Sequence, residues 1–115
     1  MRMDVRFYRT EEGEEPAYEF IMGLQPKLRA KVYGTLELLS EVGSELRAPF
    51  SKSLSEGIFE LRCQFGSDTV RVLYFFHKDR IVVLTNGFVK KTQKVPGDEI
   101  ARAKRYRADY LRRVQ

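Results

Sequence analysis

Two arginines stand within apolar, strand-like segments in the second half of the chain, Arg62 in the run 58–65 and Arg71 in the run 69–76. A guanidinium group donates paired hydrogen bonds to a phosphate and stays protonated in proteins. Such residues can therefore bind a phosphate and stabilise negative charge that develops on phosphoryl oxygens. An arginine in a strand is also commonly a surface residue or half of a salt bridge, so its neighbours must decide between these interpretations.

The turns between the strands predict which side chains accompany the two arginines, because side chains alternate across a strand. We place the first turn at residues 67–68, within the sequence Gly-Ser-Asp. Gln64 then lies opposite Arg71, and Arg62 lies opposite residue 73. Arg62, Gln64 and Arg71 are therefore expected on the same face of the sheet.

A second turn, placed at residues 78–79, extends this face onto the next strand. It puts Asn86 opposite Arg71 and Phe88 opposite Thr69, and lysines follow directly in the chain. Lysines add positive charge, amides can hydrogen-bond, and an exposed phenylalanine lets a base stack. This combination is typical of a site for single-stranded RNA, and its residues are Arg62, Gln64, Arg71, Asn86, Phe88, Lys90, Lys91 and Gln93.

The residues of opposite parity are almost wholly apolar, which supports this assignment of faces. We expect them to be buried under helices, and they are Leu61, Cys63, Phe65, Val70, Val72, Tyr74 and Phe76.

The order of elements predicts an α+β domain. Period-two alternation marks strands at 3–8, 58–65, 69–76 and 80–88, and helical spacing marks 17–22, about 26–42 and about 98–114. Residues 46–54 are predicted as a loop with room for one more edge strand. We therefore expect a small antiparallel sheet in the order β-α-α-β-β-β-α, with the N-terminal helix hairpin packed on one face and the other face at least partly free.

Length and charge limit the classes of protein to consider. The 115 residues suffice for one domain, 1–115, and the formal net charge is +5. Residues 1–57 hold 8 Lys and Arg against 10 Asp and Glu, whereas residues 58–115 hold 13 against 6. The basic second half suits a phosphate backbone or an acidic protein partner. A solvated basic surface without a partner is the simpler alternative.

Cysteine and histidine usage gives no sign of a disulfide or a metal site, since Cys63 and His77 are the only residues of their types. No apolar run approaches the length of a membrane span. We therefore expect a cytoplasmic protein without a metal, a cofactor or a membrane partner.

Three segments carry a resemblance to a known family. They are Gly-Ile-Phe-Glu-Leu-Arg at 57–62, Arg-Val-Leu-Tyr at 71–74 and Leu-Thr-Asn-Gly-Phe-Val-Lys-Lys-Thr at 84–92. In this order and spacing the chain resembles the RelE superfamily of type II toxins, and within it the HigB-like, phage-derived RelE-like branch. The resemblance covers most of the chain, including Pro96 and the C-terminal helix.

The resemblance implies an endoribonuclease that cleaves mRNA in the ribosomal A site. Its partner would be an antitoxin encoded beside it, often with a helix-turn-helix domain. Arg62 and Arg71 match the two sheet arginines of the catalytic face, Lys52 matches a lysine ahead of the strand 58–65, and Lys90 and Lys91 match the family's F-x-K-K segment.

The chain departs from the better-characterised pattern because no histidine or tyrosine stands at the catalytic end of its last strand. Tyr106 and Tyr110 on the final helix are interpreted as packing residues. His77 falls in a turn at the other end of the sheet and is assigned no catalytic role. A lysine among Lys52, Lys90 and Lys91 is left as the candidate general base, and ribosomal RNA could also contribute.

Two other functions fit the same fold. ParE-type relatives inhibit DNA gyrase and are not nucleases, and the cluster of arginines and lysines argues against that interpretation. A non-catalytic module that binds RNA or an acidic protein through its basic face is the second alternative.

Overall fold

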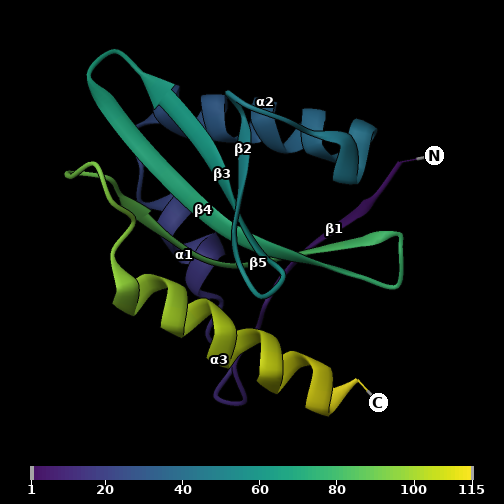
Figure 1. Cartoon of the computed structure of the whole chain (residues 1–115). Coiled ribbons are helices and arrows are strands. Elements are labelled where there is room, and N and C mark those ends of the chain that lie inside the picture. Colours follow the sequence, from purple (N-terminus) through teal and green to yellow (C-terminus); the bar gives the residue numbers. More distant parts are fainter. Residues whose placement is uncertain (1, 115) are drawn as a thin grey trace.

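The computed structural model describes residues 2–114, which form a five-stranded sheet with helices on both faces (Figure 1). In chain order the elements are β1 (Asp4–Phe7), α1 (Pro16–Met22), α2 (Pro26–Val42), the 3-10 helix η1 (Gly43–Glu45), β2 (Ser51–Ser55), β3 (Ile58–Phe65), β4 (Asp68–His77), β5 (Ile81–Val89) and α3 (Gly97–Arg113). The bounds of the predicted strands and helices are confirmed to within one residue, and β2 occupies the segment with room for an edge strand. Among residues 2–114, no helix combines the length and hydropathy needed to cross a bilayer.

The strand order is β1-β5-β4-β3-β2. Strands β2 to β5 are antiparallel neighbours, as the hairpin turns predict. β1, however, runs parallel to β5, with Asp4 paired to Ile81 and Phe7 to Leu84, so the prediction of an antiparallel sheet was wrong for this one strand. The reason is that a short turn determines the direction of the next strand, whereas the long connection from β1 through α1 and α2 does not.

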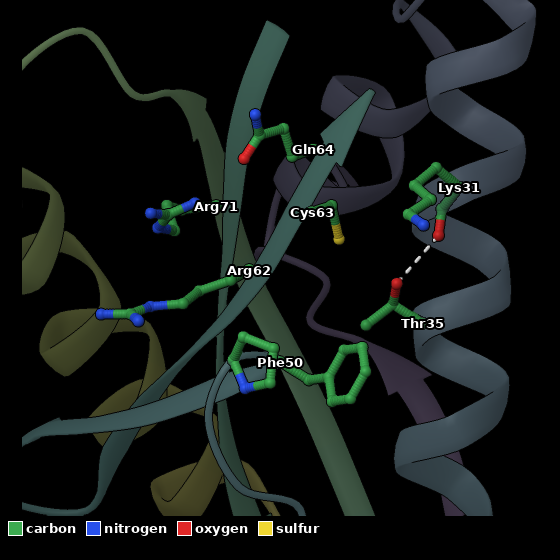
Figure 2. A pocket seen from close by; sticks show the side chains of 8 residues that line it. Lys31, Thr35, Phe50, Arg62, Cys63, Gln64 and Arg71 are labelled. Carbon is green, nitrogen blue, oxygen red and sulfur yellow. Dashed lines mark hydrogen bonds between the residues drawn. The ribbon is translucent and has the colours of Figure 1, made fainter. Parts of the chain in front are cut away.

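Helices α1 and α2 cover one face of the sheet. Figure 2 shows α2 beside β3, with the thiol of Cys63 directed toward it. The helix presents a single apolar face, because its buried side chains recur at intervals of three and four residues. These side chains are Leu28, Val32, Leu36 and Leu39, and they pack in one cluster with Leu61, Cys63, Val70, Val72 and Tyr74 of the sheet. The predicted apolar face is thus confirmed, except that Phe65 near the hairpin tip is exposed and Phe76 is only partly buried.

Helix α3 covers part of the opposite face. Its Ala103 is fully buried and belongs to a second apolar cluster with Leu73, Phe75 and Val83. The sequence pattern predicts this helix but does not indicate where it docks. Farther along β3, Arg62 and Gln64 project from the same face without being covered, since Arg62 is half-buried and Gln64 is exposed.

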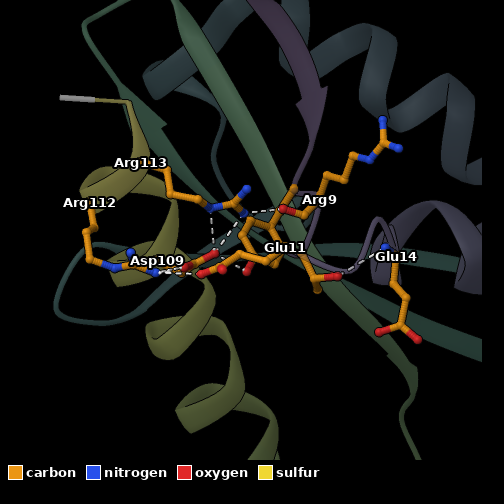
Figure 3. A network of polar contacts seen from close by, with 8 residues as sticks. Arg9, Glu11, Glu14, Asp109, Arg112 and Arg113 are labelled. Atoms are coloured by element: carbon orange, nitrogen blue, oxygen red, sulfur yellow. Dashed lines mark hydrogen bonds and ion pairs between the residues drawn. The ribbon is translucent and has the colours of Figure 1, made fainter.

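A polar network ties the last turns of α3 to the segment that follows β1 (Figure 3). The Tyr8 hydroxyl donates a hydrogen bond to Asp109 over 2.6 Å, and Arg112 donates to Glu11 over 3.0 Å. Burial, together with this bond to Asp109, raises the pKa of Tyr8 to about 12, so the phenol stays protonated and remains a donor. The hydrogen bond from Tyr8, with help from Arg113, lowers the pKa of Asp109.

The packing of α1 on β5 leaves no room for a side chain at Gly87. A Cβ atom on Gly87 would lie 2.4 Å from Cδ2 of Phe20, so Gly87→Ala must displace that ring. We expect a loss of about 1–3 kcal/mol in the free energy of unfolding, the usual cost of overpacking. Urea denaturation of both proteins measures it.

The matched control is Gly34→Ala in α2, where a Cβ would meet no atom within 4 Å. Because alanine is the better helix former by about 1 kcal/mol, this variant should be as stable as the parent or more so. Equal unfolding midpoints for Gly87→Ala and the parent would contradict the close packing of α1 on β5.

Candidate functional site

Arg62 on β3 and Arg71 on β4 are direct cross-strand partners. The observed register of β3 and β4 differs from the predicted register by two residues. The turn is formed by Gly66 and Ser67, not by residues 67–68, and Phe65 pairs with Asp68. Gly66 adopts a φ of 63°, a conformation that glycine takes without steric cost. A slip of two residues leaves every side chain on its predicted face, so the two arginines are closer neighbours than expected.

The register between β4 and β5 also keeps the predicted faces, because two deviations of one residue each add up to an even shift. His77 pairs with Ile81, so the turn holds three residues rather than two. A β-bulge then falls at Thr85, whose hydroxyl donates to the carbonyl of Leu73 over 3.1 Å. Each deviation shifts the register by one residue, and together they place Phe88 opposite Arg71 instead of Thr69.

A buried carboxylate, Glu60, joins the two arginines, and it was not among the residues predicted for the site. Its side chain is fully buried, and Oε1 accepts a hydrogen bond from Nε of Arg62 over 2.9 Å. Nε of Arg71 lies 3.5 Å from Oε2. The signal was present in the sequence, because Glu60 and Arg62 are two residues apart on one strand and therefore share a face. Both arginines are thus halves of salt bridges, one of the alternatives considered above.

The two guanidinium groups differ in exposure. The Arg62 side chain is 29% exposed and that of Arg71 10% exposed. Figure 2 shows both side chains leaving β3 and β4 on the side away from α2. Burial lowers the pKa of Arg71, and the neighbouring Arg62 lowers it further, while Glu60 opposes both effects. Arginine nevertheless stays charged in proteins, so the pair presents positive charge beside the buried anion.

Lys90 completes this cluster at the end of β5. Its backbone N–H donates to the carbonyl of Thr69 over 2.9 Å, which holds the residue beside β4. Burial lowers the pKa of the Lys90 ammonium group, and the positive charge of Arg71 is the next largest cause. Arg62 and Lys52 act in the same direction, whereas Glu60 raises the pKa. The neutral amine of Lys90 is therefore less costly to form than that of an ordinary lysine.

Two hollows in the surface meet at Lys90 and Gln93, which border both. One, of about 320 Å³, also touches Lys52, Glu60 and Arg62, and the other, of about 460 Å³, touches Gln64, Arg71 and Lys91. They bring together every predicted site residue except Asn86 and Phe88. Among residues 2–114, no group of three or more His, Cys, Asp or Glu side chains has an arrangement that could hold a metal ion.

Asn86 and Phe88 share the predicted face but are buried beneath the chain around α3. Asn86 is 2% exposed, and its amide donates to the backbone and side chain of Glu99 over 3.3 and 3.0 Å. Phe88 is 8% exposed and packs in the cluster that contains Ala103. The expectation of an exposed Phe88 was therefore wrong, because the sequence did not show that α3 docks on this face.

The aromatic residues set aside in the sequence analysis have packing contacts. Tyr106 stacks on Tyr8 with ring centroids 4.6 Å apart. Tyr110 meets Phe75 and His77 edge to face. His77 is the last residue of β4, so it lies at the end of the strand remote from Arg71.

Replacing Glu60 tests whether the buried anion holds the arginine pair. Glu60→Gln keeps the shape of the side chain but leaves the positive charge of Arg71 without its buried counterion. We expect a loss of about 3–5 kcal/mol in the free energy of unfolding. The matched control is Glu56→Gln, whose 76% exposed side chain pairs with Lys104 at the surface and should contribute less than about 1 kcal/mol. Equal losses in the two variants, measured by chemical denaturation, would refute the role assigned to Glu60.

The segment that carries this site matches a known protein family. Residues 19–108 match the family described as phage derived protein Gp49-like. The match runs from within α1 into α3 and contains every residue of the two hollows. No curated protein matches the chain significantly. The family belongs to the RelE/ParE-like toxin superfamily and is associated with the toxins of toxin–antitoxin systems, which implies an antitoxin partner. Since the match covers well over half of its length, this chain belongs to the phage-derived Gp49-like family of that superfamily.

Proposed function

We propose that this protein is the toxin of a type II toxin–antitoxin system, near the HigB-like branch, and that it cleaves mRNA on the ribosome. The observation that carries the proposal is the cross-strand pair of Arg62 and Arg71, joined by buried Glu60 and bordered by Lys90. Family membership and the positive charge of the second half support it. The protein would act in the cytoplasm and be held inactive by an antitoxin encoded beside it, of the helix-turn-helix kind.

The proposed reaction begins when the 2′-hydroxyl of the RNA gives its proton to a base. The 2′-oxygen attacks the adjacent phosphorus, and the bond from phosphorus to the 5′-oxygen breaks. The products are a 2′,3′-cyclic phosphate and a 5′-hydroxyl end, with the leaving oxygen taking up a proton. Negative charge grows on the nonbridging phosphoryl oxygens, where Arg62 and Arg71 would stabilise it as fixed donors. Two guanidinium groups supply this stabilisation without a metal ion.

Lys90 is the base that the local electrostatics favour. An arginine cannot accept the proton, because it stays charged. Lys90 borders both hollows, and burial and the neighbouring cations lower its pKa toward the range useful for proton transfer. Lys91 follows it in the chain and lines only the second hollow, where it suits binding of the RNA backbone. Lys52, Gln64 and Gln93 complete the proposed RNA-binding set.

Replacing Arg62 by alanine tests the catalytic proposal without creating a cavity in the apolar core. Expression of the parent in bacteria without its antitoxin should arrest growth and produce mRNA ends at fixed codon positions. We expect Arg62→Ala to reduce the cleavage rate by about 10²–10³-fold, the usual effect of losing one donor to a developing oxyanion. Arg71→Ala should act likewise, provided that circular dichroism confirms its fold.

Arg2→Ala is the matched control, because Arg2 pairs with Glu37 and Glu41 outside the site and its removal changes the net charge equally. It should leave arrest and cleavage intact. Full toxicity of both Arg62→Ala and Arg71→Ala would remove the proposal. Inhibition of purified gyrase in a supercoiling assay, without mRNA cleavage, would favour the ParE-type function instead.

The role of Lys90 predicts a dependence of the cleavage rate on pH. Only the neutral amine accepts a proton, so below the pKa of Lys90 the rate should rise about tenfold per pH unit. Lys90→Arg should abolish most activity and this rise, because the guanidinium stays charged, whereas Lys91→Arg should keep both. Single-turnover cleavage on programmed ribosomes, over the pH range in which they stay intact, measures the effect. Retention of the pH profile in Lys90→Arg would assign the base elsewhere.

A further inference from the structure

A third pocket, of about 360 Å³, adjoins the arginine pair at the edge of the sheet. β2 begins with Ser51 opposite Leu61, and the hydrogen bond from Arg62 N–H to the Phe50 carbonyl, 2.8 Å long, lies one residue farther along β3. Beyond it, within the described residues, no strand pairs with this side of Gln64. The pocket lies at this open edge, and Arg62 and Arg71 contribute to its wall.

Besides the two arginines, the walls of this pocket combine an aromatic ring, polar groups and the cationic side chain of Lys31 on α2 (Figure 2). Phe50 comes from the segment before β2 and is 40% exposed, although it is a large apolar side chain. Thr35 of α2 donates its hydroxyl proton to the Lys31 carbonyl over 3.0 Å, so its oxygen can still accept a hydrogen bond. Gln64 carries an exposed amide that can donate and accept. Burial raises the pKa of the Cys63 thiol, so the thiol itself stays uncharged.

These features match the parts of a nucleotide. Arginines bind the phosphate, an exposed aromatic ring stacks on a base, and amide and hydroxyl groups hydrogen-bond to its edge. The volume lies at the lower end of the range for small-molecule pockets. A carboxylate from an acidic peptide could also pair with the arginines and with Lys31, but it would leave the exposed ring of Phe50 and the amide of Gln64 unused.

We propose that this pocket holds the base of the nucleotide whose phosphate lies on Arg62 and Arg71, an inference that rests on the proposed function. Phe50 stacks on that base, and Thr35 and Gln64 contact its edge. The pocket thereby sets which RNA sequences are cleaved. The stacking role passes from Phe88, which is buried, to Phe50, on the far side of the arginine pair.

Binding of mononucleotides tests this inference separately from catalysis. The four nucleoside 3′-monophosphates and inorganic phosphate are titrated into the full chain, with affinity followed by calorimetry. At least one nucleotide should bind about tenfold more tightly than phosphate, as expected for one stacked base. Phe50→Ala should abolish that advantage without changing the affinity for phosphate, and Phe50→Tyr should preserve it.

Phe65→Ala is the matched control, because Phe65 on β3 has a similar exposure but does not line the pocket. It should leave all affinities unchanged. Equal affinity for nucleotides and phosphate in the parent, or displacement of a bound nucleotide only by an acidic peptide and not by RNA, would overturn the inference.

The cleavage pattern supplies the second readout. In the parent, sequencing of mRNA ends should give a base preference next to the cut, and Gln64→Ala and Thr35→Val should change that preference more than the total rate. If Phe50→Ala changes neither the sequence pattern nor nucleotide affinity while RNA is still cleaved, the pocket inference fails and the proposed function stands. If nucleotides bind in a way that depends on Phe50 but no RNA is cleaved, the pocket holds a nucleotide as inferred and the proposed nuclease function fails.

Discussion

The buried carboxylate of Glu60 is the interaction on which the site depends. Two guanidinium groups on directly paired residues repel each other, and Arg71 is almost completely removed from water. An isolated charge at such a depth is costly, so an anion between the strands is what permits the pair. Glu60 lies at the Nε atom of each arginine, and Nη1 of Arg71 donates to the Val70 carbonyl over 3.2 Å. The interaction that stabilises the strands thus also orients the groups that would bind phosphate.

The alternation of apolar and polar residues predicted the faces of the sheet more reliably than the pairing of its strands. A face depends only on parity, so a register error of two residues leaves Arg62 and Arg71 together. The partners depend on turn geometry and on the bulge at Thr85, which a single sequence does not signal. The predicted cluster therefore survived, although the residue opposite Arg71 is Phe88 rather than Asn86.

Contacts between elements far apart in the chain are what the sequence could not predict. The parallel neighbour of β1 and the docking of α3 both depend on packing across the sheet, and local patterns carry no record of it. Asn86 and Phe88 lay on the right face, but their exposure depended on α3. Glu60 was different, since its position two residues from Arg62 already predicted a shared face. It was overlooked because glutamate side chains usually lie at the protein surface.

The helices cover the apolar parts of the sheet and leave one charged end uncovered, which explains why this small protein can hold a charged site and remain folded. The apolar part of the α3-facing surface, around Leu73 and Phe75, is covered by α3, and the opposite face is covered by α1 and α2. The cationic cluster occupies the remaining end, where the strands continue past α3 and water or a ligand can reach it. Mutual repulsion among Arg62, Arg71 and Lys90 is there offset by one carboxylate and by hydration rather than by further burial. An anionic ligand relieves this repulsion, so the neighbouring cations, which add to the effect of burial in lowering the pKa of Lys90, also favour the binding of phosphate.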